Sequence, residues 1–138
     1  MKSLQLEPIR ADGDCSVLRI AGEIDVYTAP ELRECVIQLI GSGTRYLIAD
    51  LRRVDFLDST GLGALVGSLK RLRTRDGSLT LVISAGRIQE IFRITGLDRA
   101  FALHPSVPDA MNTDQHWHEA IASEGLSAGE WCRKHGLL

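Results

Sequence analysis

The sequence has few cysteines and no long apolar run. These absences argue against a disulfide-bonded, a zinc-binding and a membrane-spanning protein. Cys15, Cys35 and Cys132 are an odd number of thiols at wide, irregular spacing, typical of neither a disulfide framework nor a zinc-binding motif. No apolar stretch approaches the roughly 20 residues that cross a bilayer, and the first residues lack the apolar segment of a signal peptide. We therefore expect free thiols and a cytoplasmic location.

An excess of charge of either sign is also missing. The 16 basic and 18 acidic residues give a formal net charge of −2, and neither sign forms a long run. This balance does not favour binding to nucleic acid or to a membrane surface, so we expect the partner to be another protein. A chain of 138 residues that is 44% hydrophobic fits one domain around one core.

The motifs of common catalytic and nucleotide-binding loops are absent. There is no Gly-x-x-x-x-Gly-Lys-Ser/Thr or Gly-x-Gly-x-x-Gly loop. Ser59 lacks the Gly-x-Ser-x-Gly turn of hydrolases, and no histidine is tied to it by local spacing. Residues 58–61, DSTG, differ from an aspartic-protease loop by one extra residue, and no second loop supplies the paired carboxylate. We expect no enzymatic activity, no catalytic residue, no metal and no cofactor.

Strands alternate with helices along the chain. The turn at residues 11–13 joins a strand at 14–22 to a weaker strand at 4–9. Thr28 and Glu31 have the spacing of a capping box, which predicts a helix that ends at residues 41–43 and buries Cys35. The apolar run at 46–51 predicts a central strand covered on both faces.

The second half of the chain continues this alternation. We expect a helix after residues 58–60, a strand at 79–83, a helix capped by Ser84 and ended by Gly96, a strand at 100–103, and a helix capped by Ser106. Such alternation predicts an α/β domain with a parallel or mixed sheet, because parallel neighbours need crossover connections.

Residues 54–63, VDFLDSTGLG, are the most informative segment. They place Ser59 where the second helix must begin, and a helix N-terminus favours a bound or attached phosphate. One alternative is that Asp58, Ser59 or Thr60 merely caps the helix. Against a cap alone, three polar residues exceed what a cap needs, and the glycines at 61, 63 and 67 leave room for a partner. Asp58 would repel a phosphate on Ser59 and so add to a local excess of negative charge.

Four motifs in order carry a family resemblance. GEID at 22–25, TA at 28–29, VDFLDSTGLG at 54–63 and IFRITGL at 91–97 together resemble bacterial anti-sigma factor antagonists of the STAS-domain family. The resemblance covers roughly residues 4 to 110. It implies a STAS-type domain at 1–110, with a mixed β-sheet of four to five strands flanked by helices. Residues 111–138 lie beyond the resemblance, and we expect them to form a helical C-terminal extension.

The resemblance also implies a partner-switching function. In that family the unphosphorylated antagonist binds an anti-sigma factor, itself a serine kinase, and so releases a sigma factor. The kinase then phosphorylates the antagonist and breaks the complex, and a PP2C-type phosphatase resets it. The family phosphosite falls on Ser59, with Thr60 as the lesser candidate. The alternative function is a structural or ligand-sensing STAS domain, never phosphorylated, within a larger signalling assembly.

The partner-binding residues that follow from this resemblance lie in two segments. They are Asp25, Asp58, Ser59, Thr60, Gly61 and Leu62. Asp25 matches the acidic residue of the family in the loop before the first helix; the alternative is an exposed turn aspartate without a role.

The extension at 111–138 holds both tryptophans and three of the four histidines. We expect helices near 119–124 and at 128–135, the second with a capping box from Ser127 to Glu130. The tryptophans favour a tail that folds back over an apolar surface, with partner contact as the alternative. The residues His116, His118, Cys132 and His135 could surround zinc, but their spacings match no standard zinc finger.

Overall fold

The computed structural model describes residues 3–138, in which one mixed sheet holds five strands in the order β1-β2-β3-β4-β5. The first pair is antiparallel and the next three pairs are parallel. The strands are β1 Leu4–Arg10, β2 Cys15–Ile24, β3 Tyr46–Leu57, β4 Ser78–Val82 and β5 Ala102–His104. The expected α/β class is confirmed, and β3 is the central strand, as the apolar run at 46–51 predicted.

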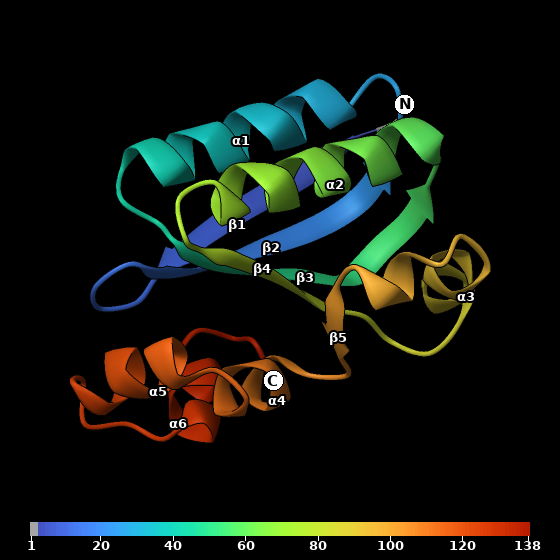
Figure 1. The fold of residues 1–138 in the computed structure, drawn as a ribbon. Coiled ribbons are helices and arrows are strands. Elements are labelled where there is room, and N and C mark those ends of the chain that lie inside the picture. Colours follow the sequence, from blue (N-terminus) through green and yellow to red (C-terminus); the bar gives the residue numbers. More distant parts are fainter. Residues whose placement is uncertain (1–2) are drawn as a thin grey trace.

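Helices cover both faces of this sheet (Figure 1). The helices α1 (Ala29–Gly41) and α2 (Ser59–Arg73) lie side by side on one face. On the other face lie α4 (Val107–Asn112), α5 (Gln115–Ala122) and α6 (Ala128–Lys134). The helix α3 (Arg87–Ile94) and the short 3-10 helix η1 (Leu97–Arg99) connect β4 to β5.

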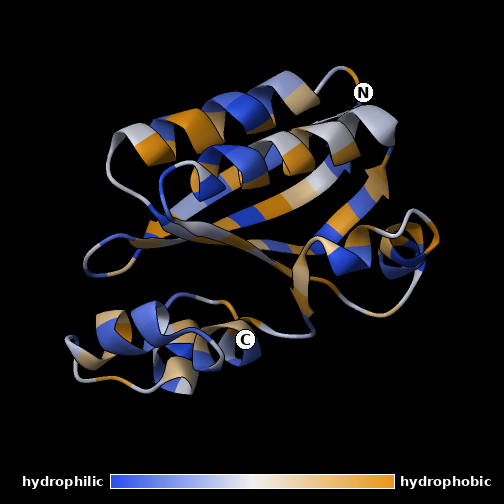
Figure 2. Cartoon of the chain, in the orientation of Figure 1, coloured by the Kyte–Doolittle hydropathy of each residue, from blue (hydrophilic) through white to orange (hydrophobic). Residues whose placement is uncertain are grey.

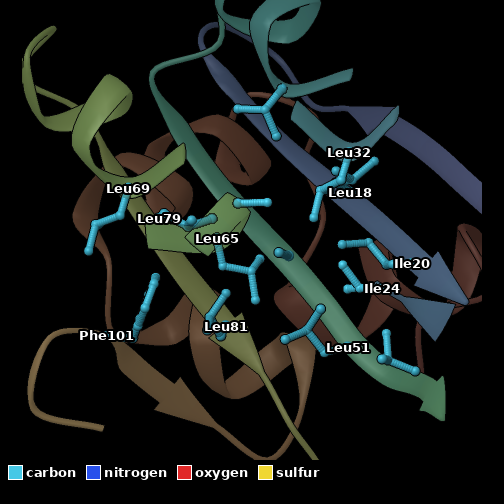
Figure 3. Packing of buried hydrophobic residues seen from close by; sticks show 14 of the residues in the cluster. Leu18, Ile20, Ile24, Leu32, Leu51, Leu65, Leu69, Leu79, Leu81 and Phe101 are labelled. Carbon is cyan, nitrogen blue, oxygen red and sulfur yellow. The ribbon is translucent and has the colours of Figure 1, made fainter. Parts of the chain in front are cut away.

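The main core fills the space between α1, α2 and the sheet (Figure 3). Because strand side chains alternate between faces, Leu18 and Ile20 of β2 point to the same side, where they meet Leu65 of α2 and its neighbours. Apolar and polar residues alternate along α1 and α2 (Figure 2), and each helix buries one set of them against the sheet. This arrangement fixes which surface of α2 is left for other contacts.

A second core lies on the opposite face, under the C-terminal helices. Val17 of β2 and Ile48 of β3 point to this side and pack with Trp117 and Trp131, which are 1% and 0% exposed. The two indole rings meet edge to face at 5.8 Å, and Trp131 donates a hydrogen bond to Glu124. The expectation that the tail folds back over an apolar surface is confirmed.

Two of the predicted helix caps were wrong. Thr28 does not form a capping box with Glu31, because its Oγ1 instead accepts the N–H of Asp25 and donates to the carbonyl of Glu23. Ser84 does not cap α3, which begins after Gly86 without a side-chain cap. Glycine at 86 has a φ of 137°, a value that a residue with a side chain rarely adopts.

Two further boundaries moved by a few residues. The last strand runs over Ala102–His104, because residues 97–99 form the 3-10 helix η1. The helix expected near 119–124 is α5, which begins earlier because Asp114 caps it. The caps at Ser106 and the capping box at Ser127 are confirmed.

All three cysteines are free thiols, as expected. Cys15 and Cys132 are buried, whereas Cys35 is only half-buried against the main core. Burial, reinforced by Asp14, raises the pKa of Cys15 to about 12. Burial also raises the pKa of Cys132 to about 11, although Arg52 opposes the shift. Both thiols therefore stay protonated and unreactive near neutral pH.

Residues 3–138 contain neither a membrane-spanning helix nor a cluster of metal ligands. No helix there is long and apolar enough to cross a membrane. No group of three or more His, Cys, Asp or Glu side chains is placed to hold a metal ion, and the Sγ of Cys132 instead contacts the sulfur of Met111.

The second core should contribute strongly to stability. We expect Trp131→Ala to lower the free energy of unfolding by about 3 to 5 kcal/mol, the usual cost of truncating a buried aromatic. Tyr27→Ala, which truncates an aromatic that is 77% exposed, is the matched control and should change it by less than about 0.5 kcal/mol. Urea denaturation followed by circular dichroism measures both. Equal small effects would show that the C-terminal helices do not pack on the sheet in solution.

Candidate functional site

The candidate site lies where the parallel strands β2 and β3 end together. Ile24 is paired with Leu57, and beyond them follow the loop at 25–28 and the first turn of α2. The N–H of Asp58 donates to the carbonyl of Ile24 at 3.2 Å and ties the two segments together. Both therefore project from the same end of the sheet (Figure 1).

Asp58 is the residue that caps α2. Its backbone is extended, and its Oδ1 accepts the N–H of Gly61 at 2.9 Å. Its carbonyl accepts the N–H of Leu62, the first bond of the helix. Of the three polar residues at 58–60, the carboxylate supplies the cap and leaves the two hydroxyls unused for that purpose.

Ser59 is the first residue of α2 and is exposed. Within residues 3–138 its hydroxyl has no hydrogen-bond partner, so a modification there breaks no internal contact. The first turn of a helix carries unpaired N–H groups and a partial positive charge, which favour a phosphate. Thr60 beside it is half-buried.

Gly61 is buried, so it offers no surface to a partner, contrary to the interpretation of the glycines at 61, 63 and 67 as one open side. A Cβ on Gly61 would lie 2.5 Å from the carbonyl oxygen of Ile24 and 2.7 Å from Cδ1 of Leu57. Only glycine lets the helix start approach the end of β2 this closely. Leu62 is half-buried against the main core, and Gly63 is exposed.

Asp25 is 1% exposed, so the interpretation as an exposed turn aspartate is wrong. Its Oδ1 accepts the N–H groups of Tyr27 and Thr28 at 2.9 and 3.0 Å. The Oγ1 of Thr28 in turn accepts the N–H of Asp25. The buried carboxylate therefore shapes the loop from inside, and a direct contact from it to a partner is closed off.

This loop displays two residues that the sequence interpretation missed. Val26 and Tyr27 are 55% and 77% exposed in the loop between β2 and α1, and the end of β2 is bonded to the α2 start through the N–H of Asp58. The signal available was two large apolar residues in a short connection that would otherwise be polar. We define Val26, Tyr27, Ser59 and Gly63 as the switch surface, because all four are exposed and belong to the loop after β2 or to the beginning of α2.

Fold and site together define a class: a mixed α/β domain that presents an unbonded serine at a helix start beside an apolar loop. The family model described as STAS domain matches residues 8–110. The chain belongs to the STAS domain family. The match ends inside α4, so the division of the chain at residue 110 stays a prediction.

Sequence relatives carry a consistent name. The chain is 44% identical over 80 residues to an anti-sigma-B factor antagonist of Staphylococcus aureus, covering 58% of this chain and 74% of that protein. It is 41% identical over 95 residues to an anti-sigma-B factor antagonist of Staphylococcus epidermidis, covering 69% and 87%. The resemblance seen in the motifs is confirmed.

Solved structures share the fold. An anti-sigma factor antagonist from Mycobacterium paratuberculosis superposes with a TM-score of 0.74 at 31% identity, over 80% of this chain and 93% of that chain. SpoIIAA in its unphosphorylated form gives a TM-score of 0.61 at 24% identity, over 73% and 87%. At that identity the second comparison supports the fold alone.

The packing of Gly61 against the carbonyl of Ile24 can be tested by substitution. We expect Gly61→Ala to lower the free energy of unfolding by about 1 to 3 kcal/mol, because the new methyl group meets the Ile24 carbonyl. Gly63→Ala is the matched control: nothing lies within 4 Å of its added Cβ, so it should stabilise the helix by about 0.5 to 1 kcal/mol. Thermal unfolding of both variants would contradict this packing if the two shifts had the same sign.

Proposed function

We propose that this chain is an anti-sigma factor antagonist that works by partner switching in the cytoplasm. When unphosphorylated it binds an anti-sigma factor that is also a serine kinase, and a sigma factor is released. Phosphorylation of Ser59 ends binding, and a PP2C-type phosphatase restores it. Binding is the activity; no catalysis, cofactor, metal, nucleic acid or membrane is involved. The relatives named anti-sigma-B factor antagonist support this role.

The observation that carries the proposal is the unbonded hydroxyl of Ser59 on an already capped helix. Because Asp58 fills the cap, Ser59 serves no structural purpose that modification would disturb. Its exposure lets a kinase reach it, whereas Thr60 is half-buried. Ser59 is therefore the favoured phosphosite and Thr60 the lesser one.

The partner surface in this proposal combines polar and apolar groups. Val26 and Tyr27 supply apolar area for a partner, and aromatic side chains commonly dominate such interfaces. Asp25 takes part indirectly, since its carboxylate holds the loop that exposes them. Gly61 takes part in the same indirect way, and Asp58, Thr60 and Leu62 border the surface.

The switch is electrostatic and local. A phosphate on Ser59 adds about −1.5 to −2 charge, and the helix N-terminus offsets this by about 0.3 to 1 kcal/mol. The neighbouring Asp58 carboxylate repels it. These terms are small beside the roughly 5 to 15 kcal/mol that stabilise a domain. The same electrostatic terms have a larger effect on binding, because about 1.4 kcal/mol changes an affinity tenfold.

The first test is the site of modification. Incubation of the purified chain with candidate anti-sigma factor kinases and ATP should place one phosphate on Ser59, mapped by mass spectrometry. Ser59→Ala should abolish it, and Thr60→Val, which keeps the shape of the neighbouring side chain, should not. Full modification of Ser59→Ala would refute the assignment and favour another residue such as Thr60. No modification of the unaltered chain would favour the unphosphorylated STAS domain within a larger assembly.

The second test is affinity for the kinase that modifies the chain. We expect Ser59→Asp to bind about tenfold or more weakly than Ser59→Ala, because a charge without a cationic partner is costly to desolvate at an interface. Isothermal titration calorimetry measures both.

Tyr27→Ala should weaken binding in the same assay without loss of stability, and Ile94→Ala, an exposed apolar residue of α3, is its control. Equal affinities for Ser59→Asp and Ser59→Ala would count against an electrostatic switch. Unchanged binding of Tyr27→Ala would count against the switch surface.

A further inference from the structure

The sheet face that carries the second core is only partly covered by the C-terminal helices. Toward the ends of β2 and β3 the register shifts: Arg19 pairs with Asp50, but Ala21 pairs with Arg53. Three residues of β3 thus oppose two of β2, which is a β-bulge. Such bulges re-aim side chains and often adjoin functional sites.

The bulge turns two consecutive arginines to the same face. Leu51 and Val54 both pack into the main core, on the side of α1 and α2. Between them, Arg52 bonds to Asp50 and to the carbonyl of Leu137 on the opposite face, and Arg53 lines a hollow there. A regular strand would have sent one of the two toward the main core.

Two adjoining hollows of about 330 and 130 Å³ share Arg19 and Arg53 in their walls. The larger hollow is bounded on its β1 side by Gln5 and Glu7. The small side chain of Ala21, on β2, lies between Gln5 and Arg53. We call the two together the arginine hollow. Its volume is in the range of sites for small molecules.

The arginines of this hollow differ in how strongly they are already paired with carboxylates. Arg52 bonds to both oxygens of Asp50 at 2.9 Å, and this interaction raises its pKa. Among the described residues, Arg19 forms an ion pair only with Glu7, at 3.4 Å, and that carboxylate is 63% exposed. Arg53 has no hydrogen-bond or ion-pair partner within residues 3–138. Two guanidinium groups therefore remain available beside one weakly held carboxylate.

We propose that the arginine hollow binds a small molecule with a diphosphate group. Each guanidinium presents a planar fork that matches phosphate oxygens, so Arg19 and Arg53 can each hold one phosphate. The amide of Gln5 on the wall supplies a further donor. The ligand displaces Glu7 from Arg19, a solvent-exposed contact of little strength.

This site is separate from the switch surface. The hollow opens on the face opposite α1 and α2, whereas Ser59 belongs to α2. The proposal therefore does not rest on phosphorylation of Ser59. A concave site of this volume suits a small molecule better than an acidic protein segment, which needs a broader contact area.

Titration of the ¹⁵N-labelled chain with inorganic pyrophosphate tests the proposal. Amide shifts should change at residues 5–7, 19–21 and 52–54. We expect Arg53→Gln to raise the dissociation constant about tenfold, since a charge-assisted hydrogen bond is lost. Arg99→Gln, which removes an exposed arginine of η1, is the matched control and should leave it unchanged. Ala21→Val keeps every charge but fills the hollow, so it should also weaken binding.

Three results with pyrophosphate would overturn the proposal. One is equal binding by Arg53→Gln and Arg99→Gln, and another is a shift pattern centred on residues 59–62. Undiminished binding by Ala21→Val would show attraction to surface charge instead of a hollow. Parallel titrations with ADP and with a phosphoserine peptide distinguish the sources: tighter ADP binding supports a nucleotide, whereas a tighter peptide would replace the small molecule by a protein partner.

Discussion

The contact between the first turn of α2 and the carbonyl of Ile24 is the constraint on which the site depends. That oxygen accepts the N–H of Asp58 and leaves space for nothing larger than the hydrogen of Gly61. A carbonyl in this position joins the end of β2 to the start of α2 across the parallel pair. The position of Ser59 is therefore fixed by backbone packing, and the serine hydroxyl is spared any structural role.

The buried carboxylate of Asp25 fixes the shape of the neighbouring loop, also through buried hydrogen bonds. A buried charge is costly unless hydrogen bonds compensate it, and here two backbone N–H groups do so. Those bonds hold the loop in one shape, with Val26 and Tyr27 outside. Both halves of the switch surface thus rest on buried polar contacts, so the surface is already ordered and would lose little entropy on binding the partner that we propose.

The two faces of the sheet have separate tasks. One carries α1 and α2 over the main core and so positions the switch surface. The other carries the tryptophan core under α4 to α6, and beyond it the arginine hollow. Because β3 is buried on both faces over residues 47–51, it is the shared wall between the two cores. The strand β2 is shared in the same way, with Leu18 in the main core and Val17 in the second core.

Local patterns in the sequence determined the elements and their order. The apolar run at 46–51 predicted the central strand, the motif at 54–63 predicted a helix that begins at Ser59, and Ser127 with Glu130 predicted the capping box of α6. Each of these depends on neighbours within a few residues, so no tertiary information was needed. The family resemblance likewise rests on short motifs, and the family match confirmed it.

Only the tertiary structure decided the environment of individual side chains. Asp25 looked like a turn residue and Gly61 like part of an open helix side, yet both are buried because β2 and β3 end side by side there. The capping box at Thr28 failed because the hydroxyl found partners in Asp25 and Glu23. The shared face of Arg52 and Arg53 follows from a bulge, which has no mark in the sequence. Burial and register depend on segments far apart along the chain, and a local pattern does not contain them.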